Sequence, residues 1–495
     1  MNIALETMLQ LCILLPVLSA IGVVASNNYP NLREGLTIVT GLIILSFTIS
    51  IYSSLGAGET IHAQWGEILP GLKLSFSVEP LGMLFALVAS FLWPVTTLYS
   101  IGYMRNHNEK NQTRFYACFA IAIGCVMGIA FAGNLFTLFI FYEVLTLSTY
   151  PLVTHSGSEN AKKGGRTYLA ILLSTSIAFF LLAILGTWFV AGTLDFTPGG
   201  VFGANVDLTV AGILLALFIF GIGKAAIMPF HRWLPAAMVA PTPVSALLHA
   251  VAVVKAGVFT VVKVCVYIFG IDLLGELPST QALLYLAGAT VLLSSIVAMR
   301  QDNLKARLAY STVSQLGYVT IGALMASSFG IVGGSMHIVM HAFGKIALFF
   351  CAGAILVATH KTQISQMRGL GQQMPITMVA FFIASLSIIG VPPTGGTWSK
   401  WFLLMGTLET QQWIIMSVLL VSSLLNIAYL LPIPFRAFFP GSQVEQIDNE
   451  IREAPLPSLI ALCIVTLLCV VLFVYPQPLY DLANAILVNP AGAIQ

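Results

Sequence analysis

The chain has 495 residues, of which 58% are hydrophobic and only 8% are charged, and its formal net charge is +2. Soluble domains carry about 25% charged residues, so this composition excludes a soluble protein, and the near-neutral charge gives no case for nucleic-acid binding. The apolar runs approach or exceed the roughly twenty residues that a helix needs to cross a bilayer, so they predict helices rather than the strands of a membrane barrel.

The hydropathy pattern predicts an all-α integral membrane protein with fourteen transmembrane helices. The expected spans cover residues 5–26, 35–55, 80–103, 114–132, 135–154, 167–192, 208–228, 241–269, 280–299, 304–326, 329–358, 374–409, 411–433 and 456–475. The first lacks a basic leader, so we expect a retained span rather than a cleaved signal peptide. Residues 59–79 differ, because a turn at Pro70 and Gly71 joins short alternating stretches, and they predict a small hairpin outside the membrane.

Two expected spans contain interruptions. Gly223 lies in the seventh span and Pro229 directly follows it, and Pro392 and Pro393 lie in the twelfth. Proline cannot donate a backbone hydrogen bond and glycine weakens a helix, so both spans are expected to be broken. The prolines in the connection between the seventh and eighth spans, Pro229, Pro235, Pro241 and Pro243, could instead simply shape a loop. Interrupted helices at matching positions of two halves are typical of a transport site near the middle of the bilayer.

The spans also suggest an internal repeat. Spans four to eight (residues 114–269) and nine to thirteen (280–433) each hold five helices over nearly equal lengths, with the broken span fourth in each unit. An odd number of crossings reverses the orientation of the second unit, so the sequence predicts two inverted five-helix repeats. Residues 1–113 would then add three spans and the hairpin, and residues 434–495 a loop and the last span.

The basic residues predict the orientation. If the amino terminus faces outside, the inside loops hold most of the 21 lysines and arginines, and the outside loops hold only Lys73. By the positive-inside rule we therefore expect both termini on the outside. The other basic residues fall within apolar spans, and they are Lys224, Lys255, Lys263, Lys345 and Lys400.

Charged side chains inside the bilayer cost roughly 2.5–3.5 kcal/mol each on insertion scales, so they are candidate functional groups. Glu143 is the one acidic residue expected in mid-span. A pair of Glu143 and Lys224 could take up or release a proton as the two groups approach and separate, although Glu143 could also be a structural counter-ion. Lys263 lies nearest the outer end of its span, and a side chain that extends to the membrane surface explains it equally well.

Three histidines extend this set. His337 and His341 precede Lys345 at four-residue intervals, so the three lie along one helix face, as a proton relay requires. His249 lies in the eighth span with Lys255. Each histidine could instead be a packing or core residue. The sequence thus predicts a line of proton-transfer groups bridged by buried water, made of Glu143, Lys224, Lys255, Lys345 and Lys400 with His249, His337 and His341 as relay.

Motifs for other chemistries are absent from the sequence. It has no GxxxxGK[ST], GxGxxG or HExxH pattern, and its seven cysteines are scattered without a CxxC. We therefore expect no cofactor and no metal, and neither ATP-driven transport nor redox chemistry on this chain. We expect that the chain is not an enzyme. It would count as a translocase only as part of a redox-driven complex.

Three stretches resemble signature segments of the antiporter-like membrane subunits. They are PFHRWLPAAMVAPTPVSALLHAVAVVKAG (229–257), NLKARLAYSTVSQLGY (303–318) and HIVMHAFGKIALFF (337–350), and the similarity covers about residues 75–430. That family includes the A and D subunits of Mrp-type sodium/proton antiporters and the proton-pumping membrane subunits of respiratory complex I and membrane-bound hydrogenases. The resemblance implies fourteen helices, inverted five-helix repeats and broken seventh and twelfth helices.

The resemblance also implies a proton-transfer role at each matching position. These are the fifth-helix glutamate Glu143, its seventh-helix partner Lys224, the eighth-helix Lys255 and His249, the eleventh-helix His337, His341 and Lys345, and the twelfth-helix terminal group Lys400. The length resembles that of the D-type component, whereas APTPVSALLHA and the histidines resemble the A-type component or the most distal complex I component.

The expected function is therefore the proton-translocating subunit of a multi-subunit sodium/proton antiporter in a bacterial cytoplasmic (inner) membrane. Its partners would be other membrane subunits, the lipid bilayer, protons and sodium, with no nucleic acid. Two alternatives stay open: an antiporter-like subunit of a complex I-type NADH:quinone oxidoreductase or membrane-bound hydrogenase, and the membrane subunit of a two-component bicarbonate uptake system. A scaffold role with a degenerate channel is disfavoured by the full set of charged groups.

Overall fold

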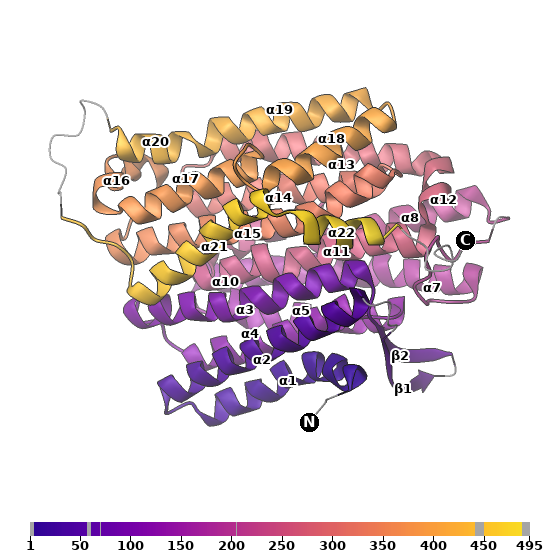
Figure 1. Ribbon diagram of the computed structural model, residues 1–495, viewed down its shortest axis with the longest axis horizontal. Helices are drawn as coiled ribbons and strands as arrows, with labels where there is room; N and C mark the ends of the chain where they lie inside the picture. Colours follow the sequence, from indigo (N-terminus) through magenta and orange to yellow (C-terminus); the bar gives the residue numbers. More distant parts are fainter. Residues whose placement is uncertain (1–3, 57–60, 70, 204, 441–449, 488–495) are drawn as a thin grey trace.

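The computed structural model describes residues 4–56, 61–69, 71–203, 205–440 and 450–487, and most of these residues are helical (Figure 1). The amino-terminal helices are α1 (Leu5–Ala25), α2 (Pro30–Gly56) and α3 (Pro80–Asn106). The next are α4 (Gln112–Ala130), α5 (Leu135–Val153), α6 (Glu159–Thr175), α7 (Leu181–Ala191), α8 (Leu208–Gly221), α9 (Trp233–Ala236), α10 (Thr242–Ala246), α11 (Val253–Val264) and α12 (Ile271–Glu276).

The second half of the chain continues the helical bundle. Its helices are α13 (Pro278–Arg300), α14 (Leu304–Leu324), α15 (Ser328–Thr359), α16 (Leu370–Gln373), α17 (Pro375–Ile389), α18 (Gly396–Glu409), α19 (Trp413–Leu430), α20 (Pro432–Phe438), α21 (Leu456–Val474) and α22 (Gln477–Ala485). Several helices begin at a polar residue whose side chain accepts a hydrogen bond from the first turn, as helix caps do. These caps are Asn134, Ser158, Asp207, Asn303 and Ser327.

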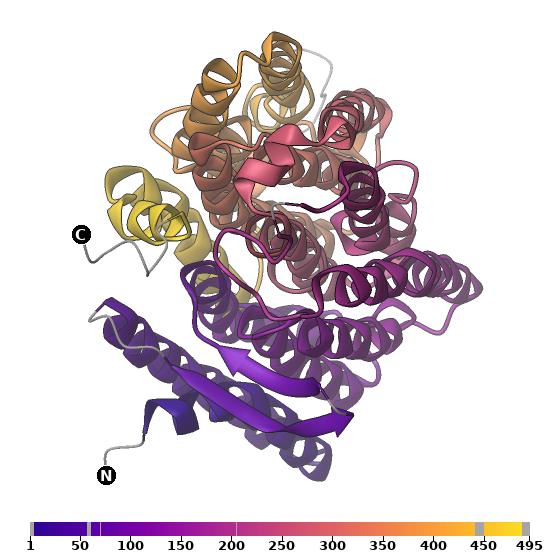
Figure 2. The same ribbon diagram turned by 90° about the vertical axis from the view of Figure 1, so that its right-hand side faces the viewer.

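A two-stranded hairpin lies at one end of the bundle (Figure 1), and Figure 2 looks onto this end. Strands β1 (His62–Leu69) and β2 (Leu72–Ser77) pair antiparallel within the stretch for which the sequence predicts a hairpin. β1 packs against α1 and β2 against α5. Phe76 anchors the hairpin, because its ring centroid lies 4.6 Å from that of Trp65 and 5.8 Å from that of Phe141.

Within the described parts of the chain, eleven helices are long and apolar enough to cross a membrane. Counting joined helices once, they are α1, α2, α3, α4, α5, α6 with α7, α10 with α11, α13, α15, α19 with α20, and α21. Two shorter apolar helices, α8 and α17, are the first parts of the two spans expected to be broken. The all-α membrane fold is confirmed, whereas the count of fourteen and the two inverted repeats stay predictions.

Both expected helix breaks are present. α8 ends at Gly221, and only a short 3₁₀ turn, Gly223–Ala225, follows before the chain turns at Ala226 with φ +56°. α17 ends at Ile389, and Gly390, Pro392 and Pro393 lie in the connection to α18. Each break therefore leaves backbone groups of a membrane helix without their usual intrahelical partners.

The eighth span lies at the centre of the bundle. It consists of α10, a π-helical turn at Leu247–Val251, α11 and a second π-helical turn at Cys265–Phe269. Its most apolar stretch is entirely buried inside the protein, and α11 packs against both α14 and α15. π-helical turns are rare and often occur at functional sites, and His249 lies in the first of them.

Candidate functional site

Four lysines from four different elements lie in the interior of the bundle. Lys224 follows the break after α8, Lys255 lies on α11, Lys345 on α15 and Lys400 on α18. The first three are fully buried, and Lys400 is 7% exposed. Since an unpaired buried ammonium is costly, the partners of each lysine define what the site can do.

Lys224 is held by α5. Its Nζ donates to the carbonyl oxygen of Tyr142 at 2.8 Å and to Oγ1 of Thr146 at 2.6 Å, and it lies 3.1 Å from the centroid of the Tyr142 ring. The backbone N–H of Lys224, which the helix break frees, donates to the Tyr142 hydroxyl at 3.1 Å. The backbone N–H that the break frees and the Lys224 ammonium thus both bind Tyr142.

Glu143 lies between these partners on α5 but makes no ion pair with Lys224 within 4.0 Å in the described structure. Its Oε1 atom is buried and has no hydrogen-bond partner among the described residues. The structure therefore brings the two predicted groups to the same stretch of α5 without joining them. A buried acceptor without a partner is costly, so the position of this oxygen requires an explanation beyond packing.

A chain of two polar contacts and one ring stack leads from Lys255 to Ser399 at the start of α18. Lys255 Nζ lies 2.5 Å from Nδ1 of His341, and the rings of His341 and His337 are stacked with centroids 5.8 Å apart. The Nδ1 atom of His337 lies 2.9 Å from Oγ of Ser399, whose chain neighbour is Lys400. These groups come from α11, α15 and α18, three helices far apart in the sequence.

The second helix break directly supports Lys400. Its Nζ donates to the carbonyl oxygen of Ile389, the last residue of α17, at 2.9 Å, and to Oγ of Ser423 at 3.1 Å. The ammonium also lies 4.6 Å from the centroid of the Tyr318 ring. Because α17 stops at Ile389, this carbonyl lacks its helical partner and is free to accept from the lysine.

Lys345 and His249 lie beside this chain of contacts. Lys345 Nζ donates to the Leu308 carbonyl at 3.2 Å and to Oγ of Ser311 at 2.6 Å, and the Tyr429 hydroxyl donates to the same Oγ at 2.9 Å. Both ring nitrogens of His249 are buried without a hydrogen-bond partner among the described residues, and its ring packs on Phe349. His337, His341 and Lys345 do share α15, but Lys345 turns toward α14.

Several neutral side chains complete the site and were missed in the sequence. On α14, Ser311, Gln315 and Tyr318 follow at spacings of four and three, which places them on one helix face. Ser311 binds Lys345, Gln315 Oε1 lies 3.1 Å from His337 Nε2, and Tyr318 lies under Lys400. Polar residues at helical spacing inside an apolar span were the signal that could have found them.

Lys263 corrects one interpretation. Its side chain is fully buried and does not extend to the membrane surface. It forms an ion pair with Glu79, and its Nζ donates to the Ala132 carbonyl at 2.7 Å. The interpretation that Lys263 extends to the membrane surface is wrong, because the Glu79 carboxylate and the Ala132 carbonyl bind its ammonium inside the protein.

The described residues contain no group of three or more histidine, cysteine, aspartate and glutamate side chains that could hold a metal ion. The seven cysteines are all described, and each is a free thiol.

Residues 132–426 match the family described as NADH:quinone oxidoreductase/Mrp antiporter, transmembrane region. The chain belongs to this family. It is 32% identical over 414 residues to NADH-quinone oxidoreductase subunit N of Desulforudis audaxviator, an alignment that covers 82% of this chain and 81% of that protein. It is 30% identical over 482 residues to the A-type component of the Na(+)/H(+) antiporter of Alkalihalophilus pseudofirmus, which covers 89% of this chain but only 57% of that protein.

Solved structures of this antiporter-like family share the fold. A chain of the Mrp complex from Dietzia superposes with a TM-score of 0.87 at 22% identity, with 99% of this chain and 98% of that chain covered. A chain of respiratory complex I from Thermus thermophilus gives a TM-score of 0.79 at 20% identity, with 97% and 99% covered. The protein is thus an antiporter-like, multi-pass membrane subunit related to both Mrp and complex I subunits.

Proposed function

We propose that this chain is the proton-translocating subunit of a multi-subunit monovalent cation (sodium)/proton antiporter in a bacterial cytoplasmic membrane. The observation that carries the proposal is the chain of contacts from Lys255 through His341 and His337 to Ser399, which is adjacent to Lys400 in the sequence. Side chains from three helices form it, and all of them are buried. Relatives and structural neighbours that belong to antiporter and respiratory assemblies support the presence of partner membrane subunits.

In this proposal, protons move along the chain of contacts in single steps. Lys255 and His341 are close enough to exchange a proton directly. The Ser399 hydroxyl donates to the Gly396 carbonyl and orients His337 through its Nδ1 atom, and a bridging water would carry the proton from there to Lys400. The stacked rings of His341 and His337 need a small rotation or a bridging water between them. Charge that arrives at one lysine repels charge on the next, because unscreened like charges interact strongly in an apolar interior.

Glu143 and Lys224 form the second part of the proposed route. The break at Gly223 gives the Lys224 backbone freedom that a continuous helix would lack. A shift of the ammonium from Tyr142 toward Glu143 would create an ion pair and so change how strongly both groups hold a proton. Conformation would then control proton uptake without any redox cofactor.

A redox-driven complex is the second candidate, because the match to oxidoreductase subunit N covers 81% of that protein. In such a complex the same groups would move protons, and electron transfer in other subunits would supply the energy. The two candidates differ in what drives the flux, which makes them experimentally distinct.

The test is proton flux in vesicles that carry the native assembly. We expect an imposed sodium gradient to drive proton movement without NADH or quinone, and Lys255→Ala to reduce it at least tenfold while the assembly stays intact. Lys162→Ala, at an exposed ion pair with Glu159, is the matched control and should leave flux unchanged. Flux that needs NADH and quinone would favour the redox candidate, and wild-type flux in Lys255→Ala would refute the proposed route.

A further inference from the structure

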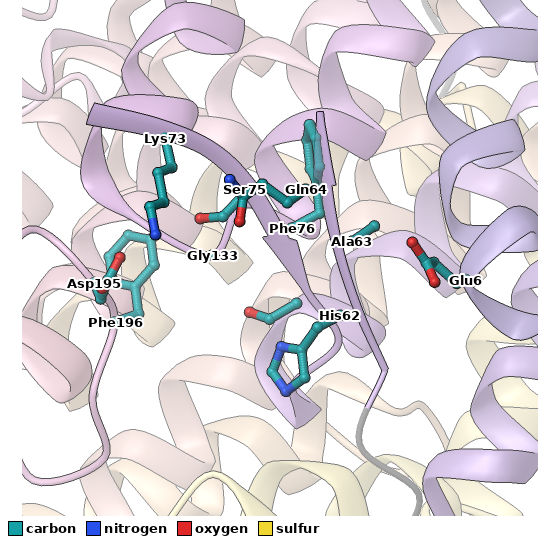
Figure 3. Close-up of a pocket in the computed structure, with 11 residues that line it drawn as sticks. Glu6, His62, Ala63, Gln64, Lys73, Ser75, Phe76, Gly133, Asp195 and Phe196 are labelled. Carbon is teal, nitrogen blue, oxygen red and sulfur yellow. The ribbon is translucent and has the colours of Figure 1, made fainter. Parts of the chain in front are cut away.

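A polar pocket of about 470 Å³ lies beneath the hairpin, at the end of the bundle that Figure 2 faces. Figure 3 shows the Lys73 side chain extending toward Asp195 and Phe196, with His62 and Ser75 along the wall. The start of α1 closes one side through Glu6. No step of the proposed route uses this pocket.

The pocket shares its wall with the buried ion pair of Lys263 and Glu79. The Phe196 ring lines the pocket and lies 4.4 Å from Lys263 Nζ. Ala132, whose carbonyl accepts from the same ammonium, precedes Gly133 in the pocket wall. The Lys263 side chain is 0% exposed, whereas the Glu79 side chain is 14% exposed. Glu79 is not itself a lining residue, but it follows the lining residue Ser77 by two positions, so the pair joins a fully buried cation to a partly exposed side chain beside the pocket.

The surroundings of Lys263 are built for a cation. Besides the carboxylate and the carbonyl, the rings of Phe196 and Phe259 lie 4.4 and 5.4 Å from the ammonium, as in cation–π contacts. A buried ion pair is weak evidence for stability, because desolvation of both charges offsets their attraction. A stabilising role alone therefore does not account for this arrangement.

We propose that Lys263 and Glu79 form a further proton-exchange site, which opens to the hairpin face through this pocket. The inference rests on the proposed function and adds a port to the same conduction route. In the exchange step, the N–H bond of the ammonium breaks and an O–H bond forms on the carboxylate, which leaves an amine and a carboxylic acid. The acid then releases its proton to pocket water, and a proton from the interior restores the ammonium.

Lys263 of the proposed exchange site, or port, lies on α11, the helix that also carries Lys255 of the chain of contacts. Lys263 and Lys255 are eight residues apart on α11, which is roughly 12 Å along a helix. Phe259 lies between them, and its ring centroid is 4.9 Å from that of Phe85 on α3. One apolar layer thus separates the port from the chain of contacts, and movement of this layer would control the exchange.

Glu79 has a second titratable neighbour besides Lys263, and further titratable groups line the pocket beside it. Tyr267, in the π-helical turn after α11, is its neighbour on the interior side. On the pocket side the titratable groups are Glu6, His62, Lys73 and Asp195. Glu6 and Asp195 are acidic and Lys73 is basic, so the charged pocket residues sum to −1 and favour cations.

Lys263→Arg separates a proton-exchange role from a structural one. Arginine keeps the positive charge and the ion pair, but its guanidinium does not release a proton in proteins. In vesicles with the native assembly, we expect Lys263→Arg and Glu79→Gln each to lower proton flux at least tenfold. Lys162→Arg, at the exposed pair with Glu159, should leave flux unchanged. Wild-type flux in Lys263→Arg would overturn the inference and leave a structural pair.

Two further measurements keep the outcome decisive. Lys255→Ala is assayed in parallel: loss of flux there but not in Lys263→Arg refutes the port alone, whereas wild-type flux in both refutes the proposed function as well. If Lys263→Arg does not assemble, infrared difference spectra of the wild-type assembly on acidification decide the matter. We expect a carboxylic acid band that Glu79→Gln removes, and a spectrum unchanged by Glu79→Gln would overturn the inference.

Discussion

Each interior lysine is stabilised by neutral oxygen or nitrogen atoms rather than by a carboxylate, with Lys263 as the exception. Lys224 and Lys345 each bind one carbonyl and one hydroxyl, and Lys400 does the same. Such partners accept a hydrogen bond from an ammonium but also tolerate a neutral amine. This tolerance is what a group that gains and loses protons requires.

Ser399 offers the most direct test of the proposal that protons pass along neutral and basic side chains inside the bundle. Its hydroxyl connects His337 to the helix that carries Lys400, and it is fully buried. We expect Ser399→Ala to lower proton flux about tenfold, which corresponds to roughly 1.4 kcal/mol of barrier, without loss of assembly. The measurement is flux per assembled complex in vesicles.

Ser417→Ala on α19 is the control for that experiment. Its hydroxyl is exposed and bonds only the Trp413 carbonyl of its own helix. Equal flux in the wild type and both variants would mean that the proposed route does not depend on the Ser399 hydroxyl.

Charged residues in apolar spans were readily found in the sequence, but their partners were not. The opposite charges of Glu143 and Lys224 inside apolar spans suggested a pair, yet side-chain geometry at a helix break directs the ammonium to Tyr142 and Thr146 instead. For Lys263, the deciding partner is Glu79, which lies far away in the sequence and was counted as a loop residue. Such pairings depend on tertiary packing, which hydropathy does not encode.

At the scale of elements, the helix breaks act as binding groups as well as interruptions. The end of α17 supplies a carbonyl to Lys400, and Gly390 makes room for that contact. Gly390 has a φ of +84°, and a Cβ atom there would lie 2.5 Å from Cδ of Lys400. Both the backbone conformation and the packing at this position therefore require glycine.

Gly390→Ala should therefore displace the Lys400 side chain. We expect a loss of proton flux and a destabilisation of about 1 kcal/mol or more, because alanine at positive φ is strained. Thermal unfolding of the purified assembly and flux in vesicles are the two measurements. Gly275→Ala on α12 is the matched control, since a Cβ atom there meets nothing within 4 Å. Equal behaviour of the two variants would contradict this account of the break.

The breaks and the hairpin could be predicted because proline, glycine and alternation act locally. Helix lengths were less accurate: α6 begins at Glu159, well before the expected span at 167–192, because Ser158 caps a polar first turn that hydropathy assigns to a loop. The π-helical turns of the eighth span carry no local sequence signature, so packing around His249 could only come from the structure.

At the scale of the whole molecule, the charges divide between the two ends of the bundle. Arg33 and Arg105 bind the buried Glu34 where α2 begins and α3 ends, and the hairpin lies where α3 begins. Arg33 and Arg105 therefore lie at the opposite end of the bundle from the hairpin. With the positive-inside rule, this places the hairpin and both termini outside in our proposal.

Thiol labelling tests that orientation. A membrane-impermeant maleimide should react with Gln64→Cys, on the exposed face of β1, in right-side-out vesicles and not in inverted ones. Lys162→Cys, in the exposed first turn of α6, should show the opposite pattern. Both variants are made in a chain whose exposed Cys463 is replaced. A reversed pattern would invert the proposed topology and move the port to the cytoplasmic side.

The complete enclosure of the eighth span has a consequence for biogenesis. During synthesis, Lys255 must enter the membrane before the ribosome has produced α15, which carries its later partner His341, whereas Glu79 and Ala132, the partners of Lys263, are already made. Until α15 is made, the unpaired Lys255 ammonium costs roughly 2.5–3.5 kcal/mol in lipid. We therefore expect the nascent segment to wait at the insertion machinery, or against α3 and α5, until the later helices emerge and close around it.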